Sequence, residues 1–83
     1  MTRAPTDADI ATVMTRLAEA RDRGRSFCPS EVARALSDDW RPLMPEVRRV
    51  ARDIGLQATQ SGRPVDPVTA KGPIRLRRAG DRG

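Results

Sequence analysis

The hydrophobic period of this 83-residue chain changes at Gly55. Before this glycine, apolar residues recur at the spacing of an amphipathic helix; after it, they alternate with polar residues as in a β-strand. A chain of this length has room for one small core, so the helices and the strands must share it. The sequence therefore predicts a mainly α-helical α+β domain with a small antiparallel β-hairpin.

The first predicted helix spans residues 7–23 and carries one apolar stripe at helical spacing. Thr6 or Asp7 can cap its N-terminus, and Gly24 is expected to end it. Residues 1–5 lack this period and are expected to form a flexible arm. The stripe consists of Ile10, Val13, Met14, Leu17 and Ala18.

A second helix is predicted over residues 29–36, after a linker or very short strand at residues 25–28. Ser30 is its expected N-cap, and Glu31 is expected to lie at the positive end of its dipole. Cys28 can be a reactive thiol or a buried small hydrophobic residue. We favour the second interpretation, because no His or nearby Lys assists the thiol.

The third helix is predicted over residues 44–54, after a tight connection at residues 39–43. Asp38 and Asp39 are expected to cap this helix rather than to bind a cation. Trp40, the one Trp of the chain, is expected to fill the gap between the second and third helices.

Two strands are predicted after Gly55, which suits the C-terminal cap of the third helix. They span residues 56–60 and 74–77, and a long loop at residues 63–73 is expected between them. Ser61–Gly62 is a turn signal. The strands are expected to pair antiparallel.

The alternation in the last strand predicts which side chains are buried. Ile74 and Leu76 are expected to face the core beside Leu56, and Arg75 and Arg77 are expected to face solvent. The order of helices and strands is that of a winged helix-turn-helix, with three helices and a two- to three-stranded wing. We expect one such domain over residues 6–78 and a disordered tail at 79–83.

Five short blocks of sequence are distinctive when taken together. They occupy residues 27–36, 40–41, 43–45, 65–67 and 72–77. These blocks resemble a small bacterial family known as domain of unknown function 3253, over about residues 10–78. The resemblance implies a winged-helix-like fold in a bacterial cytoplasmic protein. It implies no established activity and transfers no catalytic or binding residue.

Several kinds of chemistry lack their residues in this chain. It has no His and one Cys, so a zinc site built from Cys and His, a Ser-His pair and a Cys-His pair are all excluded. We therefore expect no catalytic residues, no metal, no cofactor and no enzymatic activity. The chain also shows neither an N-terminal apolar signal region nor an apolar run long enough for a membrane span, so we expect a cytoplasmic location and no membrane partner.

Positive charge is concentrated in the second half of the chain. Residues 1–40 carry a net charge of −1, and residues 41–83 carry +6. A basic half fits a polyanion, because each neutralised phosphate releases condensed counterions. The competing interpretation is compositional, since fifteen of the sixteen basic residues are Arg.

Two functions follow from this pattern. The first is a DNA-binding module that uses the basic face of the third helix and the wing on double-stranded DNA. The second is a protein-interaction or scaffold module of the same shape. The oligomeric state stays open. The candidate nucleic-acid-binding residues are Arg48, Arg49, Arg52, Arg63, Lys71, Arg75 and Arg77.

Overall fold

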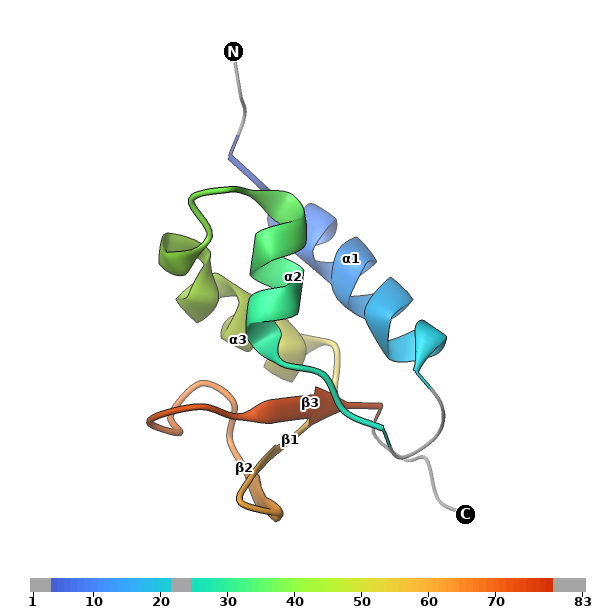
Figure 1. The fold of residues 1–83 in the computed structure, drawn as a ribbon, viewed down its shortest axis with the longest axis vertical. Helices are drawn as coiled ribbons and strands as arrows, with labels where there is room; N and C mark the ends of the chain where they lie inside the picture. The colour runs from blue at the N-terminus through green and yellow to red at the C-terminus, as the bar shows by residue number, and fades with distance from the viewer. Residues whose placement is uncertain (1–3, 22–24, 79–83) are drawn as a thin grey trace.

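A computed structural model describes residues 4–21 and 25–78, and within them three α-helices pack on a three-stranded antiparallel sheet. Figure 1 shows the helices together above the sheet. The elements are α1 (Asp7–Ala20), α2 (Pro29–Leu36), the 3₁₀ turn η1 (Arg41–Leu43), α3 (Met44–Asp53), β1 (Gln57–Gln60), β2 (Arg63–Val65) and β3 (Arg75–Arg77). The predicted α+β class is confirmed, and the arrangement is consistent with a winged helix. The expected tail at 79–83 and part of the expected arm lie outside the described residues.

The core lies between the three helices and one face of the sheet. Each helix contacts the other two. Ala33 on α2 and Ala51 on α3 are fully buried, and such small side chains let neighbouring helices approach closely. The core consists of Ile10, Met14, Ala18, Phe27, Val32, Ala33, Val47, Val50, Ala51, Ala58, Ile74 and Leu76. No helix within the described ranges is long and apolar enough to cross a membrane.

Helix α1 begins with a capping box and ends three residues earlier than predicted. The Thr6 hydroxyl accepts the Asp9 backbone N–H at 3.1 Å, and the Asp9 carboxylate accepts the Thr6 N–H at 2.9 Å. Arg21 leaves the helix in an extended conformation, and its guanidinium pairs with Glu31. This cross-helix contact explains the earlier end. Gly24, the expected cap, lies outside the described residues.

The N-cap of α2 is Cys28, so the prediction of Ser30 was wrong. Pro29 occupies the first helical position, where its missing N–H costs nothing. The Glu31 carboxylate accepts the backbone N–H of Cys28 at 3.0 Å. Cys28 itself is half-buried rather than buried, and its Sγ lies 3.0 Å from Ser30 Oγ. The Glu31 carboxylate, three residues after the N-cap, therefore binds the N-cap N–H, and this contact takes the place of the expected Ser30 cap.

Asp38 and Asp39 do not cap α3, contrary to expectation. The turn η1 precedes this helix, and Leu43 is the N-cap, with no side-chain cap bond. The N–H of Met44, the first residue of α3, instead donates to the Arg41 carbonyl, so a backbone carbonyl of the 3₁₀ turn takes over this part of the capping role.

Helix α3 ends at Asp53, one residue earlier than predicted, and Gly55 follows it at a φ of 82° as expected. The Leu56 N–H donates to the Ala51 carbonyl at 3.0 Å, and the Gly55 N–H donates to the Arg52 carbonyl at 3.1 Å. These two bonds form a Schellman motif, which explains why a glycine is suited to this position.

The predicted loop at residues 63–73 was wrong at its start, because Arg63–Val65 forms strand β2. Ser61 and Gly62 both have positive φ, at 53° and 80°, as the tight type I′ hairpin turn requires. This turn sends the chain back along β1. Pro64 is tolerated because β2 lies at the edge of the sheet, whose order is β2-β1-β3.

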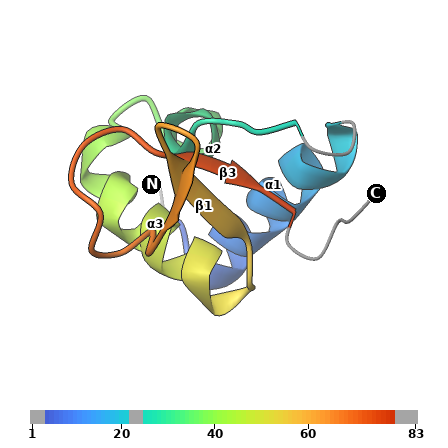
Figure 2. The same cartoon turned by 90° about the horizontal axis from the view of Figure 1, so that it is seen from below.

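Strand β3 joins the sheet to the segment that precedes α2. Leu76 is fully buried and pairs with Ala58 of β1. On its other side, Leu76 exchanges two backbone hydrogen bonds of 2.8 Å with Phe27. The short strand allowed for at residues 25–28 is thus a single bridge. The burial of Ile74 and Leu76 is confirmed, and Figure 2, seen from below, shows β1 and β3 side by side in front of the helices.

The Glu31 cap predicts a pH dependence. The Cys28 N–H and then the Arg21 guanidinium hold the pKa of Glu31 below its ordinary value of 4.5. A carboxyl group whose pKa is lower in the folded protein than in the unfolded chain stabilises the fold at pH values above its unfolded pKa. This contribution is lost as the pH falls through the folded pKa. We expect Glu31→Gln to be less stable at neutral pH and to lose less stability on acidification below pH 4.5. Urea unfolding followed by circular dichroism measures this change.

Glu19→Gln is the matched control, because the Glu19 side chain makes no hydrogen bond or ion pair with the described residues. This control is expected to follow the wild type. Parallel stability curves for the wild type and Glu31→Gln would contradict the role given to Glu31.

Candidate nucleic-acid interface

The seven predicted site residues come from three neighbouring parts of the fold. Helix α3 carries three of them, β2 and the loop after it carry two, and β3 carries two. Figure 2 shows the β2–β3 loop wrapping beside α3, so the structure brings the helix and the wing together. The partners of the seven side chains differ, and these partners decide which charges are available to a ligand.

Arg48 ties α3 to the β2–β3 loop. Its guanidinium donates to the carbonyl oxygens of Ala70 at 2.7 Å and Gly72 at 2.6 Å, with a longer contact of 3.5 Å to Pro67. Carbonyls do not cancel its charge, but they occupy its N–H groups. Arg48 therefore positions the wing, and its direct contact with a phosphate would require these bonds to break.

The loop that Arg48 holds is also braced by its own side chains. The Asp66 carboxylate accepts the Val68 N–H at 2.7 Å, and the Asp66 carbonyl accepts the Ala70 N–H at 3.0 Å. From β1, the Gln60 amide donates to the carbonyls of Lys71 and Pro73. The wing loop is thus anchored to both α3 and β1.

Arg49 is surrounded by carboxylates. It pairs with Asp7 of α1 at 2.7 Å, with Glu46 one turn earlier and with Asp53 at 3.5 Å. The hydrogen bond to Asp7, followed by the hydrogen bond to Glu46, raises the pKa of Arg49. The bond between Arg49 and Asp7 also lowers the pKa of Asp7. This cluster holds α1 against α3 and leaves a local excess of negative charge.

Arg75 contacts the segment before α2, and Arg77 contacts strand β1. Arg75 donates to the side-chain and backbone oxygens of Ser26, both at 2.9 Å. Arg77 donates to the Gln57 amide oxygen at 2.8 Å. Arg75 is exposed, as expected for the solvent face, whereas Arg77 is half-buried. Both side chains therefore support the sheet.

Three members of the predicted set have unengaged side chains. Arg52 on α3, Arg63 on β2 and Lys71 on the wing loop are exposed, and none makes a side-chain hydrogen bond or ion pair with residues 4–21 or 25–78. These three cations are the part of the predicted interface that is directly available to a ligand.

The sequence analysis missed a further basic group at the turn between α2 and α3. The guanidinium carbons of Arg34 and Arg41 each lie 4.7 Å from the centre of the Trp40 ring. Trp40 is half-buried and packs against the core, in keeping with its expected gap-filling role. An Arg directly after the only Trp was the available signal.

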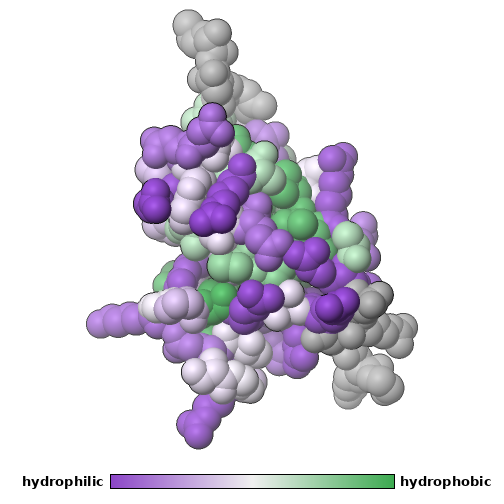
Figure 3. Space-filling view, viewed as in Figure 1, coloured by the Kyte–Doolittle hydropathy of each residue, from purple (hydrophilic) through white to green (hydrophobic). Residues whose placement is uncertain are grey.

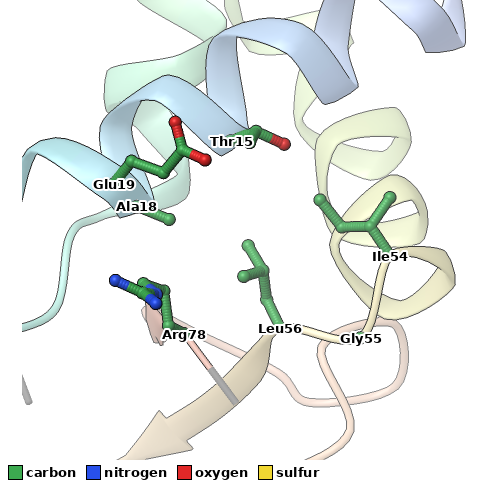
Figure 4. Close-up of a pocket in the computed structure, with 7 residues that line it drawn as sticks. All are labelled: Thr15, Ala18, Glu19, Ile54, Gly55, Leu56 and Arg78. Carbon is green, nitrogen blue, oxygen red and sulfur yellow. The ribbon is translucent and has the colours of Figure 1, made fainter. Parts of the chain in front are cut away.

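A cleft of about 280 Å³ lies between α1 and the end of α3. Figure 4 shows Ile54 and Leu56 pointing into it, with Glu19 and Arg78 at its rim.

Within the described parts of the chain, no three Cys, Asp or Glu side chains gather as a metal site would require.

A family model described as "Protein of unknown function (DUF3253)" matches residues 7–79. The chain therefore belongs to this family, and the resemblance seen in the sequence is confirmed. No curated protein matches the chain.

The Arg48 contacts predict that this side chain orders the wing loop. Arg48→Met removes the hydrogen bonds to the loop carbonyls and is expected to lower the free energy of unfolding by about 1–2 kcal/mol. The amide of Ala70 is expected to exchange its hydrogen faster. Hydrogen exchange followed by NMR measures this, and Arg52→Met is the control, expected to leave the exchange unchanged. Equal exchange in all three proteins would contradict the assignment.

Proposed function

We propose that this member of the DUF3253 family binds double-stranded DNA with little sequence preference. The surface involved is the exposed side of α3 together with the wing, which consists of the β1–β2 hairpin and the β2–β3 loop. The observation that carries the proposal is the group of unengaged cations Arg52, Arg63 and Lys71 on this helix and wing. In helix-turn-helix proteins, the second helix of the motif is the one that enters the major groove.

The charge distribution supports a polyanionic partner. Residues 41–83, which include all of α3 and all of the sheet, carry a net charge of +6. Release of condensed counterions from DNA rewards such a surface without any base contact. Arg48 adds its charge to this field while its bonds hold the wing loop beside α3.

The composition of α3 argues for weak sequence preference. The helix contains no Asn or Gln that could read adenine bidentately. Arg49 is neutralised by its carboxylates, and Glu46 and Asp53 repel phosphates. Arg52 is the one cation of α3 that is free to reach a guanine, so phosphate contacts dominate the proposed binding.

The alternative function is a protein-interaction or scaffold module without nucleic-acid binding. Its specific support is the exposure of two large apolar side chains, Ile54 at 41% and Val68 at 40%. Scattered apolar residues are common on protein surfaces, so this observation carries less weight than the group of cations.

The test is fluorescence anisotropy of a labelled random duplex of about 20 base pairs at several salt concentrations. Three phosphate contacts predict a slope of log K against log salt of about −3, with dissociation constants in the non-specific range of about 10⁻⁴ to 10⁻⁶ M. The double variant Arg52→Glu, Arg63→Glu is expected to lose this binding.

Arg16→Glu is the control for a change of net charge, because Arg16 is exposed on α1 and has no partner among the described residues. It is expected to retain most of the binding. Absence of salt-dependent binding by the wild type at about 100 μM would reject the DNA proposal and favour the alternative.

A further inference from the structure

The turn between α2 and α3 holds two guanidinium groups in fixed positions. Arg34 comes from α2 and Arg41 from η1, and both stack on the Trp40 indole at 4.7 Å. The indole packs against the hydrophobic core and is half-buried, whereas both arginines are exposed. The core therefore orients the ring, and the ring orients the two arginines.

Stacking leaves the hydrogen-bonding edges of these arginines free. A cation–π contact uses the flat face of a guanidinium, whereas its five N–H donors point outward in the plane of the group. Asp38 and Asp39 line the same surface hollow as Arg34, but within the described residues neither Arg34 nor Arg41 forms an ion pair or a side-chain hydrogen bond with them. Two oriented and unneutralised donor groups are the elements of a phosphate site.

The position of the stack relates it to the proposed interface. Trp40 and η1 directly precede α3, so the stack lies at the N-terminal end of that helix. Figure 1 places η1 on the same side of the molecule as the β2–β3 loop, with part of α3 between them. Figure 3 shows hydrophilic side chains projecting from both regions. Cations thus flank α3 at the turn and at the wing.

We propose that Arg34, Trp40 and Arg41 form a second phosphate-binding site for the DNA backbone, on the other side of α3 from the wing. The inference rests on the proposed function. A duplex presents phosphates on both sides of its groove, so a helix facing the groove can be held from both sides. The stack loses little side-chain freedom on binding, because the indole already orders both guanidinium groups.

Trp40 makes this proposal directly testable, because it is the only Trp in the chain and its fluorescence reports on the stack alone. The full chain is titrated with a random duplex of about 20 base pairs while the anisotropy of the labelled DNA and the Trp40 emission are recorded. We expect the emission to change over the same DNA concentrations at which the anisotropy rises.

The variants Arg34→Gln and Arg41→Gln remove one phosphate contact each. With these two contacts added to the three of the proposed interface, the expected wild-type slope of log K against log salt becomes about −4.5. Each variant is expected to make this slope shallower by about 0.9, and the double variant by about twice as much. Arg16→Gln is the matched control, with an unchanged slope expected. Circular dichroism verifies that every variant is folded.

The outcomes separate the two proposals. Salt-dependent DNA binding with unchanged Trp40 emission and wild-type slopes for both Gln variants would overturn the stack as a phosphate site and leave the proposed function standing. Absence of DNA binding by the wild type would overturn both. A concerted change in emission with shallower slopes would establish the site.

Discussion

The pairing of Leu76 on both sides of β3 is the constraint on which the rest of this structure depends. Its backbone bonds to Phe27, and it pairs with Ala58, while its side chain is fully buried in the core. The segment before α2 and the sheet after α3 therefore share one strand. This connection fixes the direction in which the wing leaves the helices, and Arg48 then secures the loop of the wing against α3.

Some arginines of this chain form contacts that hold the fold together, and others have side chains that are available to a ligand. Arg48 and Arg49 hold α3 to the wing loop and to α1, and Arg75 secures the segment before α2. These contacts remove hydrogen-bonding capacity from residues that composition alone would assign to a ligand. Arg52 and Arg63 remain exposed and unpaired within the described residues. The proposed interface therefore uses fewer cations of α3 than the sequence predicts. The stack of Arg34 and Arg41 on Trp40, between α2 and α3, extends this interface.

Local sequence signals predicted all three α-helices and the strands β1 and β3, because these elements carry their own periodicity. The incorrect predictions concern the caps of α2 and α3 and the strand β2. In each case another residue, a neighbouring turn or the position in the sheet took the role that the local pattern assigned elsewhere. Glu31 displaced Ser30 in the capping of α2, and a 3₁₀ turn made the expected Asp caps of α3 unnecessary. Strand β2 was missed because Pro64 within it, and Pro67 and Pro73 after it, suggested a loop. The edge position that tolerates Pro64 is a property of the sheet.

Four features follow from the amino-acid sequence alone: the α+β class, the glycine after the third helix, the burial of Ile74 and Leu76, and the uneven distribution of charge. These features depend on short-range periodicity, on the backbone freedom of glycine and on composition. Which cations are available to a ligand depends on the folded structure, because a guanidinium is engaged or free according to the groups that folding brings within about 3 Å of it. For Arg48, these groups are carbonyls more than twenty residues away along the chain.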